Sequence, residues 1–339
     1  MEKITYNLPQ SLVAQFPAEQ RDQCKLLYLK RASGELEEHV FTDIVHLLTD
    51  KHLLILNDTK VQKARLYGVG SQSGRRCEIF LVDKLTDQEW ICLVRPGKKA
   101  KAGHRFYFSA REFCEVKEIL ADGSRRVLFS GATAEELMEK YGHMPLPPYI
   151  GRDDVALDRQ MYQTVYAREG FSIAAPTAGL HFSEELFKKL EKKGVQTCSI
   201  RLDIGRGTFK MIESKHYEKH KMDMEEYWIS EEAAAAVNTA RSDGSKVVAV
   251  GTSAARALEG CFRKHGEIVA GHDDTDLFIF PGYEFKVVDA MITNFHLPAS
   301  SLLAMLAAFA GKEAILSAYE FAIENKYRFY SYGDAMFVE

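Results

Sequence analysis

Hydrophobic residues in the second half of the chain follow two patterns that alternate along the sequence. Short apolar runs, KVVAVG (246–251) and DAMITNF (289–295), have the length and composition of buried strands. Longer amphipathic segments, SEEAAAAVNTARSDG (230–244) and TSAARALEGCFRKHG (252–266), begin with Ser or Thr and end at glycine, as capped helices do. Strands that alternate with helices predict an α/β body, a mixed or parallel sheet with flanking helices.

Three further segments extend this α/β pattern. CKLLYLKRASGELEEHVF (24–41) contains two alternating runs joined by a short turn, which predicts a hairpin. HLLILN (52–57) and TDLFIF (275–280) are short apolar runs, and we expect each to form a strand.

Residues 61–130 have a different pattern, in which short runs rich in β-branched and aromatic residues recur between turn residues. That spacing predicts a small antiparallel β-barrel. A helix follows at TAEELMEKYG (133–142), and then HMPLPPYI (143–150), whose prolines require an extended connection. We therefore expect a discontinuous α/β catalytic domain, residues 1–60 and 151–339, with residues 61–150 inserted as a basic barrel and its Pro-rich connection.

Charge is distributed unevenly along the chain. The net charge is −4, yet residues 60–126 hold 15 Lys and Arg against 8 Asp and Glu, a local +7 that leaves −11 for the remainder. Four of these cations lie in one turn-rich stretch: Arg95, Lys98, Lys99 and Lys101. A basic segment on an acidic body is either a binding surface for a polyanion or an ordinary solvated face.

The sequence also carries expectations about location and metals. It contains no run of 18 apolar residues, and its first residues lack the apolar segment of a signal peptide. Its six cysteines are scattered without a C-x-x-C pair, and no His, Cys or Asp cluster has the spacing of metal ligands. We expect a cytoplasmic protein with reduced thiols, no membrane contact and no metal.

Four turn-rich segments carry small or polar residues. RLDIGRGTFK (201–210), GTS (251–253) and NFHLPASS (294–301) lie at predicted strand ends, and AAPTAGLHF (174–182) lies just before a predicted helix. A helix that starts after such a turn offers free N–H groups to an anion or a polar ligand. A histidine at a strand end can serve as an acid or base. Each turn also has a structural interpretation, as a plain reversal or a hydrogen-bonded core histidine. The aromatic stretch YRFYSYGDAMFVE (327–339) fits either base stacking or a core strand.

Taken together, the motifs resemble those of the S-adenosylmethionine:tRNA ribosyltransferase-isomerase family of queuosine biosynthesis, nearly from end to end. Three of them are very specific in combination: GHMPLPPYI, AAPTAGLHF and TNFHLP. LLILNDTKVQKARLYG, CLVRPGKKAKAG and KYRFYSYGDAMF extend the match. The resemblance implies an α/β domain with an inserted β-barrel, and a monomer.

The resemblance also implies a reaction. S-adenosylmethionine is a substrate that donates its ribosyl carbons to the aminomethyl group of 7-aminomethyl-7-deazaguanine in tRNA. The products are epoxyqueuosine-tRNA, adenine and methionine, and no metal is required. Such chemistry needs a base near the carbon beside the sulfonium and a donor for the departing adenine. The basic insert would hold the anticodon stem-loop through its phosphates.

From the motifs and the resemblance we expect three groups of site residues. The catalytic candidates are His181, His296 and Thr177. The substrate-binding candidates are Pro176, Gly179, Gly205, Gly207, Thr208, Gly251, Thr252, Ser253 and Asn294. The tRNA-binding candidates are the four cations of the turn-rich stretch. In this hypothesis the small residues of AAPTAGLHF let the backbone approach the substrate, and His181 faces it.

The chain departs from the family pattern at three places. The family usually reads L-H-V-G-x-G-T-F, H-K-M-H-x-E and G-T-T-S, where this chain has Asp203, Asp223 and Ala254 within its corresponding segments. An aspartate is anionic in water, whereas a histidine is neutral or cationic near neutral pH. These differences leave two alternatives open: a related transferase that uses another acceptor, and a tRNA-binding protein without catalysis.

Overall fold

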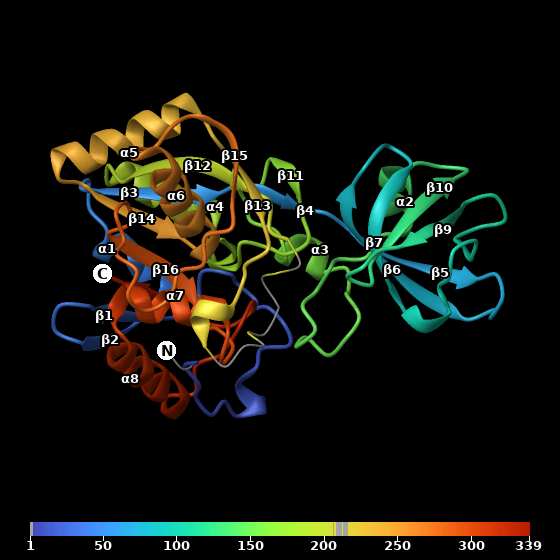
Figure 1. Cartoon of the computed structure of the whole chain (residues 1–339). Helices are drawn as coiled ribbons and strands as arrows, with labels where there is room; N and C mark the ends of the chain where they lie inside the picture. Colours follow the sequence, from blue (N-terminus) through green and yellow to red (C-terminus); the bar gives the residue numbers. More distant parts are fainter. Residues whose placement is uncertain (1–2, 206, 208–211, 213–215) are drawn as a thin grey trace. The chain divides into compact units, whose positions relative to one another are not determined.

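The computed structural model describes residues 3–205, 207, 212 and 216–339, with the side chain of Lys99 excepted. The chain forms two compact units (Figure 1). The first contains Met1–Lys60, Pro147–Arg152 and Gln160–Glu339, and the second contains Val61–Leu146 and Asp153–Arg159.

A nine-stranded mixed sheet forms the centre of the first unit. Its strands run in the order β15-β13-β12-β3-β14-β16-β17-β1-β2. In chain order these are β1 (Lys25–Lys30), β2 (Glu35–Val40), β3 (His52–Asn57), β12 (Gln196–Leu202), β13 (Glu225–Ile229), β14 (Lys246–Val250), β15 (Gly271–Thr275), β16 (Ala290–Asn294) and β17 (Ala335–Val338). β12, β3, β14 and β16 are parallel neighbours, and β17 runs antiparallel to β16. β4 (Thr59–Val61) and β11 (Glu169–Ser172) form a separate pair.

Helices cover both faces of this sheet. They are α1 (Ile44–Leu47), α4 (Glu184–Lys192), α5 (Glu231–Asp243), α6 (Thr252–His265), α7 (Ser301–Ala310) and α8 (Lys312–Glu324), with α3 (Asp158–Met161) and the 3₁₀ turns η1 (Gln10–Leu12), η2 (Phe41–Asp43), η4 (Thr177–His181) and η6 (Tyr217–Lys219) in the connections. Ser183, Ser230 and Ser300 accept a backbone N–H as N-caps of α4, α5 and α7, which satisfies one of the free donors at each start.

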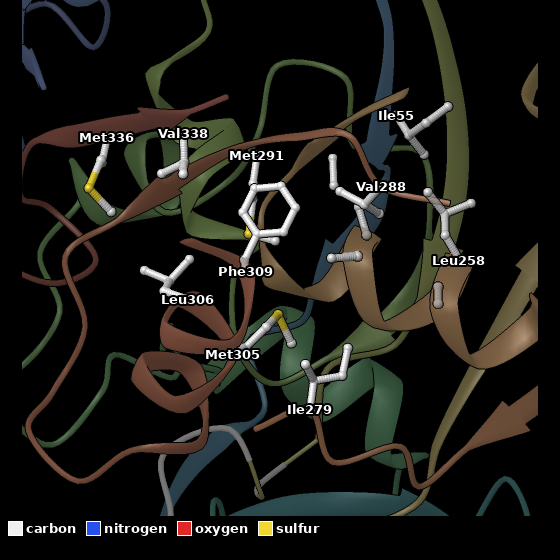
Figure 2. Close-up of a cluster of buried hydrophobic side chains, with 14 of the residues drawn as sticks. Ile55, Leu258, Ile279, Val288, Met291, Met305, Leu306, Phe309, Met336 and Val338 are labelled. Carbon is white, nitrogen blue, oxygen red and sulfur yellow. The ribbon is translucent and has the colours of Figure 1, made fainter. Parts of the chain in front are cut away.

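Alternate residues of the central strands bury against opposite helical layers. In β3, Leu53 and Ile55 belong to the core that α5–α8 close, whereas Leu54 and Leu56 belong to the smaller core under α4. Figure 2 shows the larger core, where Ile55 and Met291 from the sheet lie near helical side chains such as Leu258 and Leu306. Burial on both faces explains why these strands read as continuous apolar runs.

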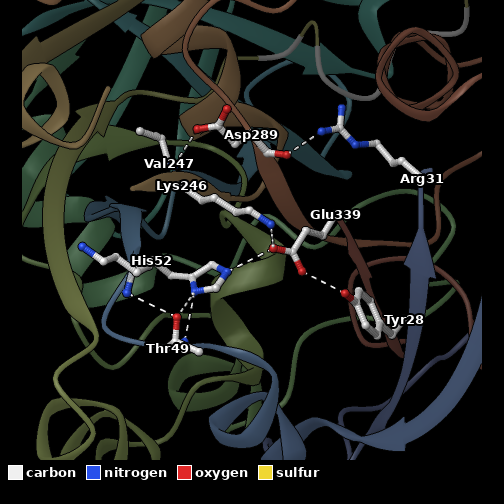
Figure 3. A network of polar contacts seen from close by, with 9 residues as sticks. Tyr28, Arg31, Thr49, His52, Lys246, Val247, Asp289 and Glu339 are labelled. Carbon is white, nitrogen blue, oxygen red and sulfur yellow. Dashed lines mark hydrogen bonds and ion pairs between the residues drawn. The ribbon is translucent and has the colours of Figure 1, made fainter. Parts of the chain in front are cut away.

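Polar contacts join the first residues of β3 and β14 to the residue that follows β17 (Figure 3). Glu339 accepts from Lys246 Nζ, from His52 Nε2 at 3.1 Å and from the Tyr28 hydroxyl at 2.8 Å. His52 and Lys246 open their strands, so this network lies at the amino ends of the parallel strands.

The second unit is a closed six-stranded antiparallel barrel of strand order β10-β7-β6-β5-β8-β9. Its elements are β5 (Arg65–Gly70), β6 (Arg76–Lys84), β7 (Glu89–Arg95), η3 (Gly97–Lys99), β8 (Arg105–Tyr107), β9 (Phe113–Ile119), β10 (Arg125–Ser130) and α2 (Ala134–Tyr141). Side chains of β6 and β7 alternate between buried and accessible positions, as the sides of a small barrel require. A mixed sheet with flanking helices and a closed antiparallel barrel confirms the predicted fold class.

One predicted strand is wrong. Residues 276–280 lie outside every strand, and the ladder with β13 is made by β15, whose sequence is GHDDT. Leu277 and Ile279 are buried in the larger core without a partner strand, which gives the segment its apolar alternation. β15 is an edge strand, where charged residues are favoured because they discourage pairing with other chains.

Within the part of the chain described, no single helix is long and apolar enough to cross a membrane. The pair α7 and α8 meets that length and composition only jointly, with a bend of 115° between the two helices.

Candidate active site

A pocket that is partly open to solvent lies where the parallel strands of the first unit end. Its walls come from the turn after β14, the turn after β16 and η4, and the loop before the antiparallel β17 reaches the same place with Tyr330 and Ser331. Ligands of open α/β sheets bind at this edge, beyond the carboxyl ends of the strands.

Seven of the predicted residues line this pocket, from three segments far apart in the sequence: Pro176, Thr177, Gly251, Thr252, Ser253, Asn294 and His296. Gly179, His181, Gly205 and Gly207 lie outside its lining, and Thr208 is outside the described residues. The structure thus brings the turns after β14 and β16 together with the start of η4.

Gly251 allows the turn from β14 into α6. Its φ of +93° and ψ of 157° lie in a region that residues with a Cβ rarely adopt. Space is not the constraint, because an added Cβ would meet Ala178 Cβ only at 3.6 Å. The next residues start α6 without a side-chain cap, and Asn57 Nδ2 donates to Ser253 Oγ at 3.1 Å. The start of this helix is therefore fixed to the end of β3.

Asn294 ends β16 with a buried side chain whose orientation is determined by its neighbours. Its Nδ2 lies 3.2 Å from the Tyr330 carbonyl oxygen, which can only accept, and 3.0 Å from His181 Nε2. Its Oδ1 is buried and has no hydrogen-bond partner among the described residues. The pocket therefore contains an acceptor that a ligand could satisfy.

His181 contacts Asn294 but does not itself line the main pocket. It contacts a smaller pocket near Arg21 and Tyr332, and its Nδ1 lies 3.1 Å from Cys24 Sγ. Burial lowers the pKa of His181 to about 4, so the ring is neutral at neutral pH.

His296 is also neutral, because burial lowers its pKa to about 3. Its Nε2 lies 2.7 Å from Thr293 Oγ1, and its backbone N–H donates to the Tyr319 hydroxyl at 2.9 Å. Nδ1 has no partner among the residues that the structure describes. A neutral imidazole held in this way can accept or donate one hydrogen bond in the pocket, according to its tautomer.

An ion pair that sequence reasoning missed also lines the pocket. Arg256 and Glu225 are each 4% exposed, and Arg256 Nη1 donates to Glu225 Oε2. Arg256 lies one turn after Thr252 on α6, and Glu225 is the first residue of β13. The position of Arg256, one helical turn after the GTS turn, could have indicated that its side chain reaches the site. Nothing in the sequence indicates that its partner is Glu225, 31 positions earlier.

The other predicted glycines have close protein neighbours. A Cβ at Gly179 would meet the Tyr166 hydroxyl at 2.0 Å, and one at Gly207 would meet Asp223 Oδ2 at 2.9 Å. The N–H of Gly205 donates to Glu225 Oε1 at 3.0 Å, which connects it indirectly to the pocket wall.

The two aspartates that depart from the family pattern, Asp203 and Asp223, are absent from the described lining of the pocket. Asp203 Oδ1 accepts from the Thr59 hydroxyl at 2.6 Å.

The tRNA-binding candidates belong to the barrel unit. Arg95 ends β7, and Arg95, Lys98 and Lys101 are exposed, whereas the side chain of Lys99 is outside the description. Among the described residues, no group of three or more His, Cys, Asp and Glu side chains is placed to hold a metal ion.

Comparison with known proteins identifies relatives over the whole chain. The family model described as queuosine biosynthesis protein matches residues 1–338. A protein of Syntrophomonas wolfei named S-adenosylmethionine:tRNA ribosyltransferase-isomerase is 46% identical over 98% of this chain and 95% of its own. One of the same name from Caldanaerobacter subterraneus is 46% identical over 98% of both. The crystal structure of an S-adenosylmethionine tRNA ribosyltransferase from Thermotoga maritima is similar, with 35% identity, a TM-score of 0.57 and 99% coverage of both chains.

Proposed function

The chain belongs to the S-adenosylmethionine:tRNA ribosyltransferase-isomerase family, transferases of queuosine biosynthesis, and from this premise we propose its reaction. It transfers and isomerises the ribosyl moiety of S-adenosylmethionine onto 7-aminomethyl-7-deazaguanine in tRNA. The products are epoxyqueuosine-tRNA, adenine and methionine.

One observation carries this proposal. Residues from three motifs that match the family, Thr177, the GTS turn 251–253 and the 294–296 turn, line a single pocket at the carboxyl ends of the parallel strands. The sheet topology alone brings these turns together, so the support for this reaction is that the residues they carry are those of the family motifs.

Within this pocket we assign His296 to the substrate. Its low pKa keeps the imidazole neutral and makes it a weak base. His296 is therefore better suited to form a hydrogen bond with the departing adenine than to abstract a proton from the substrate. Thr177 offers a hydroxyl to the same substrate. Asn294 Oδ1 accepts from a substrate amino or hydroxyl group, because it is buried and has no partner among the described residues.

His181 was predicted to be catalytic, and we propose that it acts through Asn294 as a positioning residue. It lies outside the lining of the main pocket, yet Asn294 Nδ2 is within 3.0 Å of its ring. A partner of this kind fixes which end of the amide is presented to the ligand.

The acceptor is a base within tRNA, so the enzyme also needs a surface for phosphates. We propose that the exposed cations Arg95, Lys98 and Lys101 of the barrel, together with Lys99, bind the anticodon stem-loop. This assignment rests on charge and exposure within the barrel unit.

A different acceptor was suggested by Asp203 and Asp223. Neither belongs to the described pocket lining, so neither provides a reason to change the chemistry there. The tRNA reaction remains the one that the pocket supports best.

Adenine release tests the proposal. Purified protein is incubated with S-adenosylmethionine and tRNA carrying the aminomethyl-deazaguanine, with unmodified tRNA as the control. We expect adenine only with the modified tRNA, and the mass of epoxyqueuosine in its nucleoside digest. Adenine release that does not depend on the modified base would indicate another acceptor. Salt-dependent tRNA binding without any adenine would indicate a protein that binds tRNA but does not catalyse.

A further inference from the structure

The buried pair Glu225–Arg256 has an unsatisfied donor. Arg256 Nη1 is bonded to Glu225, and Nε donates to the Leu277 carbonyl oxygen at 3.2 Å. Nη2 is buried and has no hydrogen-bond partner among the described residues. A buried guanidinium nitrogen without an acceptor is costly, and in native proteins such a nitrogen is usually satisfied by ordered water or by a ligand.

The position of the pair indicates where such a ligand would lie. Both side chains line the pocket, and Arg256 follows the uncapped start of α6 by one helical turn. The free N–H groups and the dipole of α6 favour a negative group at the same end of the helix. An anionic ligand group would therefore meet two independent sources of positive potential.

The negative partner restricts the ligand class. A simple anion would be attracted by Arg256 and repelled by Glu225, which is equally buried. A ligand end that carries both signs avoids this conflict, because its carboxylate can bind the guanidinium while its ammonium lies near the carboxylate of Glu225. An α-amino acid end has these two groups on one carbon.

We propose that Glu225 and Arg256 form the binding subsite for the zwitterionic amino acid end of S-adenosylmethionine. This deepens the proposed function and rests on it. Arg256 binds the α-carboxylate, and Glu225 is placed for the α-ammonium. The subsite selects ligands that retain the amino acid end over those that have lost it.

Two unreactive ligands test this without tRNA. S-adenosylhomocysteine keeps the amino acid end, whereas methylthioadenosine lacks it but keeps the adenosine and the sulfur. Calorimetry should show that the unaltered protein prefers S-adenosylhomocysteine by about ten- to a hundredfold, as expected for hydrogen bonds to charged groups. In E225Q/R256M, which removes both charges together, the preference should fall to within about threefold.

The double variant avoids leaving one buried charge unpaired, which would destabilise the fold. R263M changes an exposed arginine of the same helix and should retain the full preference. R256K keeps the charge and is a second test should the double variant not fold. We expect a preference reduced by about tenfold, because the single nitrogen of lysine cannot donate to Leu277 and Glu225 and also reach the ligand.

The adenine-release assay separates the two proposals. If the unaltered protein binds neither ligand and also releases no adenine with the modified tRNA, the proposed function fails with the subsite. Equal binding of both ligands, or a preference that survives in the variants, would overturn the subsite and leave the proposed function standing.

Discussion

Asn294 Nδ2 lies 3.0 Å from His181 Nε2 and determines the tautomer of a buried histidine. The Tyr330 carbonyl oxygen, 3.2 Å from Nδ2, can only accept, so this end of the amide is the donor. His181 Nε2 must then accept, and the ring carries its proton on Nδ1, toward the Cys24 thiol at 3.1 Å. Burial raises the pKa of that thiol, so the neutral ring faces a neutral neighbour.

The first prediction concerns this relationship. If His181 works through Asn294, the N294A and H181A substitutions should each lower kcat/KM by about tenfold or more, since each disrupts the same hydrogen bond. The double variant should then be no worse than N294A alone, because residues that act as one unit are not additive. Steady-state adenine release measures this cycle. Effects that multiply would assign His181 an independent role in the chemistry.

Acid should destabilise the protein through two buried histidines of the site region, His181 and His296. The pKa values of His181 and His296 are lowered from 6.5 to about 4 and about 3. As the pH falls below 6.5, the unfolded chain binds protons that the folded chain does not, so stability is greatest above pH 6.5 and decreases below it. Between pH 6.5 and 5 we expect each histidine to contribute a loss of about 1.5 kcal/mol.

Urea unfolding over this pH range measures the effect. H181Q and H296Q should each flatten the acid limb, whereas H46Q, at an exposed position, should leave it as in the unaltered protein. An acid limb unchanged in both buried-site variants would contradict the assignment.

Glu339 should stabilise the fold without affecting the chemistry. The hydrogen bond from His52, with those from Lys246 and Tyr28, lowers the pKa of this carboxylate to about 2. The contribution is therefore present above pH 4.5 and is lost as the pH falls toward 2. At pH 7 the E339Q substitution should cost about 2 kcal/mol, because it weakens bonds to a charged group.

The network of Glu339 lies at the amino ends of the strands, and the pocket lies at their carboxyl ends. E339Q should therefore leave KM and kcat unchanged at temperatures well below its unfolding midpoint. E284Q is the control, since it makes the same change of side chain at a single solvent-exposed contact with Lys286. An unchanged melting temperature in E339Q would show that the network adds nothing.

The sequence predicted helices and strands correctly where residues close together in the chain determine them. The β1–β2 hairpin is confirmed by its antiparallel register. The helix expected over 133–142 is confirmed as α2, which begins at a capping box of Thr133 and Glu136. The segment 276–280 was misassigned, because its alternation reflects burial without pairing. Which strand pairs with which is a long-range property that local patterns do not contain.

The site could be predicted only in part, for the same reason. The turns after β14 and β16 carry recognisable residues at strand ends, and both reach the pocket. Arg256 reads as an ordinary position of an amphipathic helix, and its partner Glu225 opens a strand whose neighbours are set by the sheet order. Tyr330 reaches the pocket because β17 enters the sheet antiparallel, between β16 and β1, and the aromatic stretch did not reveal that placement.

A substitution at Gly251 should show whether the glycine is needed for its backbone conformation rather than for lack of space. An alanine there has room, but it must adopt a φ of +93° with a ψ of 157°, so G251A should cost about 1–3 kcal/mol or shift the turn. Since the turn lines the pocket, KM for S-adenosylmethionine should rise. G244A, at a left-handed position closing α5, is the control and should lower stability while KM stays constant. A G251A variant with unchanged stability and KM would refute the argument.

The cations of the barrel should determine how tRNA binding depends on salt. Each phosphate contact releases counterions, so affinity falls with salt in proportion to the number of contacts. If Lys98 and Lys101 each neutralise a phosphate, the K98E/K101E variant should weaken tRNA binding and reduce the slope of log K against log salt by between about one and two. K188E/K192E makes the same change of charge at exposed positions of the α4 segment and should leave the slope unaltered.

Filter binding from 50 to 300 mM salt, roughly the range over which such slopes are resolved, measures both variants. Binding of S-adenosylhomocysteine should be the same in both, because the barrel substitutions leave every described pocket residue in place. Equal slopes in the two variants would mean that the basic stretch is an ordinary solvated face and that the tRNA phosphates are bound elsewhere.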